Sequence, residues 1–410
     1  MMLLIKYEFL KILRKKSTLL VMAVSLLLTA FLFGLPVLQY QSYHADGVSK
    51  GLAGIAHTKQ QYQAISVPMT DDYIQQTIAE YQKLFENPDN VGYDGSEKFL
   101  VGDAYWNFVA PRENQLRMIA SVYDSPDENS GLQKLLELDP KKNMAFAQAR
   151  TDKVTALLNT PSRNLSTEQK EYWSSRNSKV KTPLQYGYYE GWEIILSSFE
   201  LLLFPLFAVC IAIAPVFCGE YQAGTDAVIR SGKYGKTRLA TAKITASLLF
   251  GILAFTVHII VSFGLPLAAF GIDGWNLPLQ IAGTAIPYPF TFLQASLCNL
   301  GVIYLVLLAM AGLTLLLSAK MKSPYLVLVI LIPVLFLPLF LSPNGTTGAY
   351  NLTLFLLPYR SMSPEIGKYI SYQIGGLVFD ALSMRAVLYA SFTAIVLPLA
   401  RLCFQKHQAA

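Results

Sequence analysis

The feature that most constrains the fold is a set of six apolar blocks. Each is about 20 residues long, which is the length that a helix needs to cross a hydrocarbon core of roughly 30 Å. The blocks are residues 17–40, 194–218, 244–270, 289–318, 325–341 and 386–402. Charged residues make up only 15% of the 410-residue chain, whereas soluble domains contain about 25%. The sequence therefore predicts an all-α membrane protein with a six-helix transmembrane bundle.

The distribution of lysine and arginine around these blocks predicts the orientation of the bundle. The two terminal segments and the segments after the second and fourth blocks carry 14 basic and three acidic residues, whereas residues 41–192 carry 16 basic and 19 acidic ones. Because cytoplasmic segments are enriched in Lys and Arg, we expect a multi-pass protein of the cell membrane with both termini in the cytoplasm and residues 41–192 outside the cell. The net charge of +6 then reflects topology and gives no reason to expect nucleic-acid binding.

Residues 1–16 are expected to form an amphipathic helix. Its apolar residues gather on one side and its charged residues on the other. The two sets are Ile5, Phe9, Leu10, Ile12 and Leu13 against Glu8, Lys11, Arg14 and Lys15. Such a helix would lie in the cytoplasmic interface of the membrane; the alternative is a simple basic flank of the first span. That span, residues 17–40, is longer than a signal-peptide core, so we expect it to stay as an anchor.

Residues 41–192 are expected to form a mainly helical extracellular domain, because a segment of this length can hold its own core. Ile74, Ile78 and Tyr81 repeat at helical spacing. Residues 166–169 have the composition of a capping box. No alternating strand pattern of useful length is visible in the segment.

A second extracellular stretch, residues 343–382, is also expected to contain helical elements. It includes an amphipathic piece at 366–379 that is too polar to span a membrane. At the end of this stretch, Asp380 and Arg385 are expected to form an ion pair at the outer rim of the bundle.

Motifs for catalysis or cofactor binding do not appear in the sequence. The four histidines are scattered, with no metal-ligand spacing and no nucleophile elbow. The segment Gly235-Lys236-Thr237 lacks the glycine that a phosphate-binding loop needs five positions earlier, where Arg230 stands. We therefore expect no catalytic residue, metal or cofactor in this chain, and no enzyme activity. The four cysteines lie in or beside apolar blocks, so no disulfide is expected.

Glu200 is the main ionisable residue inside an apolar block. A charge at the centre of a spanning helix costs about 2.5 to 3.5 kcal/mol on insertion scales. Glu200 lies on roughly the same helical face as Glu193, so it could line a polar substrate pathway. The alternative is a carboxyl group near the outer end of the span that is hydrated or hydrogen-bonded at a subunit contact.

The segment 220–243 joins the second and third blocks. It has an acidic start, glycine hinges and five basic residues, which favours a helix lying along the cytoplasmic face. Its flanks read Cys218-Gly219-Glu220-Tyr221, then Gly224-Thr225, and finally Arg238-Leu239-Ala240-Thr241-Ala242-Lys243. Together with the amphipathic N-terminal helix, the large insert after the first span and the broken external helix before the last, this pattern resembles the permease subunit of type-2 ABC exporters.

The resemblance implies that the chain moves a peptide, lipid or ion across the cell membrane, using a separate ATPase that binds ATP and Mg²⁺. Two permease subunits, identical or different, would face each other within the lipid bilayer. A coupling helix at about residues 219–240 would sit in a groove of each ATPase, braced by the N-terminal helix. The residues implied in this contact are Glu220, Tyr221, Gly224, Thr225, Arg230, Lys233 and Lys236. Glu220 would cap or orient the coupling helix, whereas a purely topological role is the alternative for the three basic residues.

Two other functions are compatible with the sequence. The chain could be a membrane-anchored sensory or peptide-binding module with ABC-like architecture that does not itself transport. It could also be a membrane-anchored enzyme with an external domain, although that function would need a reactive cluster and none is visible. The sequence does not predict which substrate an exporter of this kind would carry.

Overall fold

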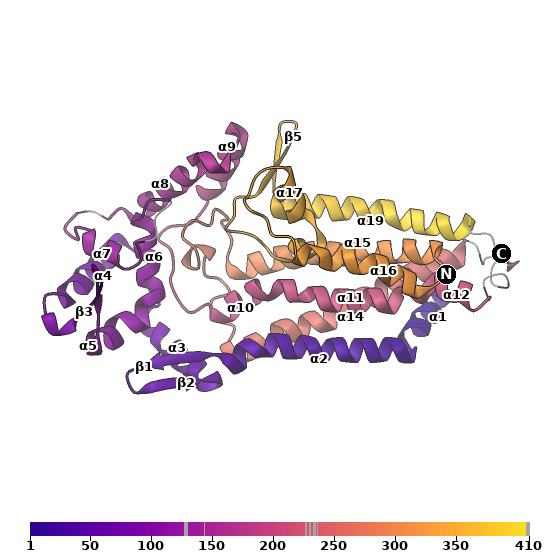
Figure 1. The fold of residues 1–410 in the computed structure, drawn as a ribbon, viewed down its shortest axis with the longest axis horizontal. Coiled ribbons are helices and arrows are strands. Elements are labelled where there is room, and N and C mark those ends of the chain that lie inside the picture. The colour runs from indigo at the N-terminus through magenta and orange to yellow at the C-terminus, as the bar shows by residue number, and fades with distance from the viewer. Residues whose placement is uncertain are drawn as a thin grey trace.

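The computed structural model describes residues 1–126, 130–142, 144–225, 228, 231–232, 235 and 237–406. Within this part of the chain the protein is mostly helical, with an elongated helical bundle and a separate domain at one end of it (Figure 1). The N-terminus and the end of helix α19 (Ala381–Lys406) lie at the opposite end of the bundle, here called the terminal end. The separate domain, residues 41–189, is called the head domain.

Five helices of the described chain are long and apolar enough to span a membrane. They are α2 (Lys16–Gln39), a composite helix over Glu190–Gln222, α14 (Arg238–Phe270), α15 (Phe292–Lys320) and α19 (Ala381–Lys406). The composite helix consists of α10 (Glu190–Ser198), η5 (Phe199–Leu202), α11 (Leu203–Ile213) and α12 (Pro215–Gln222). Within the bundle α15 packs along α19, and α2 packs against both α11 and α14.

The fifth apolar block of the sequence forms a shorter helix than the others. α16 (Pro324–Phe336) is followed directly by η7 (Leu337–Leu339). Pro333 lies inside α16 and Pro338 inside η7, and each proline removes a backbone hydrogen-bond donor. Five of the six predicted blocks thus form helices that are long and apolar enough to span a membrane, and a crossing by α16 stays a prediction.

The amphipathic N-terminal segment is confirmed as a helix, α1 (Met2–Leu13). It turns away from the direction of α2 at the terminal end (Figure 1) and packs against α14. Ile12 is buried in the core of the bundle, and the Phe9 ring contacts the ring of Phe250 on α14. The helix is thus attached to the bundle by one face.

The head domain is built mainly from helices, as its sequence predicts. They are α3 (Gly51–Ile65), α4 (Asp71–Leu84), α5 (Gly102–Ala104), α6 (Glu113–Tyr123), α7 (Gln133–Glu137), α8 (Phe146–Asn159) and α9 (Thr167–Asn177), with the short turns η1 (Pro88–Asn90), η2 (Tyr105–Val109), η3 (Ala110–Arg112) and η4 (Pro161–Arg163). The capping box is confirmed, because Ser166 Oγ accepts a bond from the Gln169 N–H at 3.2 Å and Gln169 Oε1 accepts one from the Ser166 N–H at 2.9 Å. Ile74, Ile78 and Trp173 are fully buried and belong to a core that continues into the bundle.

Three antiparallel hairpins in the described chain differ from the sequence prediction. They pair β1 (Gln41–His44) with β2 (Gly47–Lys50), β3 (Val91–Asp94) with β4 (Glu97–Leu100), and β5 (Ser371–Ile374) with β6 (Leu377–Asp380). The helix predicted for 366–379 is wrong, because this stretch forms the third hairpin. Its two-residue turn is Gly375-Gly376, and Gly375 has a φ of +60°, the left-handed conformation that such turns require.

The helical part of the stretch 343–382 is limited to two short helices, α17 (Ala349–Leu356) and α18 (Pro358–Met362). The predicted ion pair between Asp380 and Arg385 is also wrong. Asp380 ends strand β6 and pairs with Arg176 of α9 at 2.8 Å. The buried guanidinium of Arg385 instead donates to the carbonyl oxygens of Phe355 at 2.9 Å and Ser363 at 2.6 Å. Asp380 therefore binds a partner in α9, whereas Arg385 binds partners in the segment 355–363.

Arg150 on α8 joins the head domain to the segment that leads into α15. Its side chain is buried, and it donates from Nε to the Thr284 carbonyl at 2.8 Å and from an Nη to the Ile286 carbonyl at 3.1 Å. These carbonyls follow the short turn η6 (Leu279–Ile281). Burial lowers the pKa of Arg150 to about 10, so the group stays charged at neutral pH. Charged donors form the stronger hydrogen bonds, and this contact therefore fixes the head domain to the bundle.

Replacing Arg150 with Met should loosen this joint, because hydrogen bonds to a charged group contribute about 1.5 to 3 kcal/mol. We expect faster amide hydrogen exchange across residues 282–286 than in the unmodified protein. Arg117→Met is the control, because Arg117 pairs with Glu113 on an exposed helix surface, where ion pairs contribute at most about 1 kcal/mol. Equal exchange in the two variants would contradict the role given to Arg150.

Candidate functional site

The composite spanning helix is interrupted at its terminal end by Pro215, which begins α12 two residues after α11 ends. Proline cannot donate a backbone hydrogen bond, and a hydroxyl group from α15 fills part of the gap. Ser318 Oγ accepts from the Phe217 and Cys218 N–H groups, each at 3.1 Å, and donates to the Ala214 carbonyl at 2.6 Å. The break in the helix is therefore also its attachment point to α15.

α12 ends in a Schellman motif at Gly224. The Gly224 N–H donates to the Tyr221 carbonyl and the Thr225 N–H to the Glu220 carbonyl, both at 3.1 Å, and these are the two bonds that define the motif. Gly224 has a φ of +64°, a conformation that costs a residue with a side chain roughly 1 to 2 kcal/mol. The Gly-Thr pair singled out in the sequence is thus a helix stop.

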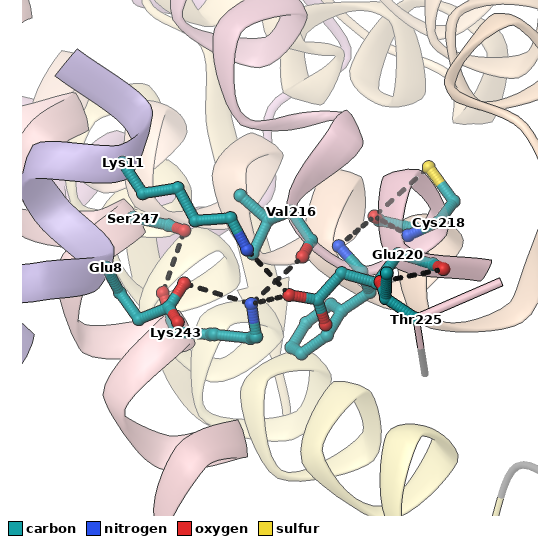
Figure 2. Close-up of polar contacts among 10 residues, drawn as sticks. Glu8, Lys11, Val216, Cys218, Glu220, Thr225, Lys243 and Ser247 are labelled. Carbon is teal, nitrogen blue, oxygen red and sulfur yellow. Dashed lines mark hydrogen bonds and ion pairs between the residues drawn. The ribbon is translucent and has the colours of Figure 1, made fainter. Parts of the chain in front are cut away.

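Four charged side chains from three helices form a compact network beside this helix end (Figure 2). Glu220 Oε1 accepts hydrogen bonds from Lys243 Nζ at 2.6 Å and from Lys11 Nζ at 2.7 Å. Lys243 Nζ also donates to Glu8 Oε2 at 2.9 Å and to the Val216 carbonyl at 3.4 Å. Because these residues belong to α12, α14 and α1, the network ties the end of one spanning helix to the start of the next and to the N-terminal helix.

The centre of this network is shielded from solvent. The side chain of Lys243 is 1% exposed and that of Glu220 is 6% exposed. Buried charges of this kind are stable only when they are paired and hydrogen-bonded, and here two ammonium groups face two carboxylates. Burial lowers the pKa of Lys11, but the contact with Glu220, together with the nearby Glu8 and Lys243, outweighs this effect and raises the pKa above its ordinary value. Lys11 therefore stays charged at neutral pH.

Glu220 lies in the last turn of α12, where the helix dipole disfavours a negative charge. Among the described residues its carboxylate accepts hydrogen bonds only from Lys11 and Lys243. The roles that the resemblance implies for Glu220, capping or orienting the coupling helix, stay predictions, because part of that helix lies outside the described residues. The two ammonium groups compensate the unfavourable position of the charge.

The remaining predicted site residues lie in several places. Tyr221 and Thr225 are on the same helix end as Glu220, and the Tyr221 hydroxyl donates to the Ala319 carbonyl of α15 at 3.3 Å. Glu200 lies in η5, far along the composite helix, and its Oε2 accepts a hydrogen bond from the Tyr359 hydroxyl of α18. Arg230, Lys233 and Lys236 fall outside the described residues. The structure therefore places Glu220, Tyr221, Gly224 and Thr225 together at the end of α12. Glu200 lies apart from them in η5.

Sequence reasoning missed the partners of Glu220. From the sequence, Lys243 is placed at the end of the flank that resembles the family and has no predicted partner; in the structure Lys243 lies inside α14. Glu8 and Lys11 are expected on the charged side of an interfacial helix, and in the structure both face the network. The spacing of Glu8 and Lys11 was the signal in the sequence that could have revealed these contacts. Residues three apart lie on one helix face, and the opposite charges of Glu8 and Lys11 are complementary to those of Lys243 and Glu220.

Comparison of the chain with protein-family models, with curated proteins and with solved structures gives no match. Among the described residues, no group of three or more His, Cys, Asp or Glu side chains is arranged to hold a metal ion. The chemistry of the network itself is structural, because its four charges neutralise one another and hold three helices in register.

Removing both partners of the central ion pair should cost less stability than the two single removals added together. Lys243→Met leaves the buried Glu220 with one fewer counter-charge, and breaking a buried pair costs about 3 to 5 kcal/mol. The double variant Glu220→Met/Lys243→Met should lose less stability than the sum of the two single variants. The measurement is the midpoint of thermal unfolding in detergent, with Lys6→Met as an exposed-lysine control. Strictly additive losses would show that the pair is not energetically coupled.

Gly224→Ala should destabilise the end of α12 through its backbone alone, because no atom lies within 4 Å of the added methyl group. We expect a loss of about 1 to 2 kcal/mol and faster amide exchange at Thr225. Gly224→Asn should lose less, since asparagine tolerates positive φ. Gly264→Ala is the matched control, because it also meets open space but lies inside α14, where alanine is favoured over glycine. Similar behaviour of the two alanine variants would rule out the helix-stop role.

Proposed function

We propose that the chain is the permease subunit of a type-2 ATP-binding cassette exporter, in which separate ATPase subunits supply the energy and two permease subunits face each other. The observation that carries the proposal is the buried network of Glu220, Lys243, Lys11 and Glu8. It braces both ends of a loop that has no nucleotide-binding motif of its own. In this proposal the terminal end faces the cytoplasm and the head domain lies outside the cell.

The network gives the loop between α12 and α14 the mechanical properties that a coupling element needs. A force applied to this loop would act on both helices together, because Glu220 and Lys243 join them through a hydrogen bond of 2.6 Å. α1 would follow through Lys11 and Glu8. α15 would follow through Ser318, which bonds directly to the backbone of α12. A single force on the loop would therefore displace α1, α12, α14 and α15 together.

The same helices offer a route from the terminal end to the head domain. α15 begins just after the segment whose carbonyls at Thr284 and Ile286 accept hydrogen bonds from Arg150. A tilt of α15 would thus be accompanied by a movement of the head domain. Glu200 is a candidate for the substrate pathway, because it is half-buried in the 3₁₀ segment of a spanning helix. The proposed cargo class remains a peptide, a lipid or an ion.

A second candidate function is a sensory or peptide-binding module that does not transport. A cavity of about 770 Å³ between the head domain and the bundle favours it. The cavity is lined by Asn114 and Lys153 of the head domain and by Glu190 and Glu193 of α10. Its size suits a small ligand or part of a peptide, and its place at the joint would allow binding to shift the head domain.

Chemical crosslinking from the loop tests the proposal. Val228 is 76% exposed, so Val228→Cys should present a reactive thiol to any partner of the loop. The background carries Cys298→Ser and Cys403→Ser, since these native thiols are not buried. With a short thiol-to-amine reagent added to inside-out membranes, we expect a crosslink to a P-loop ATPase, identified by mass spectrometry.

Leu52→Cys in the head domain is the control, because Leu52 is 65% exposed and should capture no ATPase. On intact cells a membrane-impermeant maleimide should label Leu52→Cys, whereas Val228→Cys should react only after permeabilisation. Labelling of Val228→Cys on intact cells would refute the orientation. A crosslink to another class of membrane protein, with no ATPase captured, would favour the sensory module.

A further inference from the structure

A second cavity, of about 540 Å³, lies beside the ion-pair network at the terminal end. It is bounded by α1 and the turn that follows it on one side, and by the α11–α12 junction on the other. Its apolar wall includes Ile12, Ala212 and Val216. A cavity with such a wall is suited to a hydrocarbon chain, because apolar surface leaves water at a gain of about 25 cal/mol per Å².

The lining of the cavity also carries positive charge that the network does not neutralise. Two of the four basic residues that line the cavity, Lys11 and Lys243, are paired with the two acidic ones. The other two, Arg14 and Lys15, are exposed, and within the described chain neither side chain forms an ion pair. The lining therefore has two positive charges in excess, both on the same side as the turn between α1 and α2.

The position of these charges matches the depth of phospholipid headgroups. Lys15 directly precedes α2, the first helix long enough to span a membrane. Residues at the boundary of a spanning helix lie at the level of the lipid phosphates, and clusters of Lys and Arg there attract anionic lipids. The lining thus combines a charged part at the start of α2 and an apolar part, the two kinds of surface that a phospholipid molecule presents.

We propose that this cavity binds one anionic phospholipid from the bilayer, with its phosphate against Arg14 and Lys15 and part of an acyl chain along Ile12, Ala212 and Val216. Free phosphate would leave the apolar wall unfilled. A protein segment would place backbone N–H and C=O groups against that wall without partners, which is costly. The bound lipid would fill the space between α1 and α12 and so stiffen the attachment of α1.

The test uses the full chain purified in a mild detergent and examined by native mass spectrometry with added phosphatidylglycerol or phosphatidylcholine. The expected result is retention of one phosphatidylglycerol molecule and no retention of phosphatidylcholine. Arg14→Gln/Lys15→Gln should weaken phosphatidylglycerol binding by about 30-fold, since each basic residue near a lipid phosphate contributes roughly a factor of five. The matched control is Lys6→Gln/Lys16→Gln, which removes two exposed basic residues of the same region that do not line the cavity.

Three outcomes would overturn the proposal. The first is equal retention of both lipids by the unmodified protein. The second is an equal loss of binding in the two double variants, which would indicate general electrostatic attraction and no defined site. The third is displacement of the lipid by millimolar inorganic phosphate, which would identify a simple anion site. Circular dichroism of both double variants checks that each one folds, and a failure of ATPase capture in the crosslinking experiment leaves this result unaffected.

Discussion

The rest of the terminal end depends on the ion pair between Glu220 and Lys243. A loop between two spanning helices can transmit force only if the helices cannot slide past each other, and apolar contacts alone resist sliding weakly in a lipid environment. The pair opposes such sliding, because a shift of either helix would separate two charges in a site that excludes water. Glu8 and Lys11 extend this constraint to α1 and make the whole group electrically neutral.

The head domain depends on the same kind of chemistry at the other end of the molecule. Arg150 and Arg176 of this domain each use a charged guanidinium to hold a segment that is distant in sequence and lies outside the domain. Arginine suits this role because its planar group presents several donors in a fixed geometry. The head domain is therefore connected to the bundle by directional contacts as well as by apolar packing.

The fold could be predicted from the sequence where a local signal was sufficient. Helix length identified five spanning helices, and the pattern at Ser166 and Gln169 identified a capping box. The third hairpin was missed because apolar periodicity was given more weight than the Gly375-Gly376 turn. The partners of Glu220 and Asp380 were missed for a different reason: each lies about 200 residues away in the chain or on another helix, and no local pattern specifies such a pair.

The hydroxyl of Ser318 gives the break at Pro215 a further property. A hydroxyl group rotates freely about its bond, and here it has two N–H donors and one carbonyl acceptor within reach. It can therefore follow a change in the angle between α11 and α12 without leaving a buried backbone group unsatisfied. The break at Pro215 can therefore act as a hinge between α11 and α12, and the hydrogen bonds of Ser318 hold this hinge against α15.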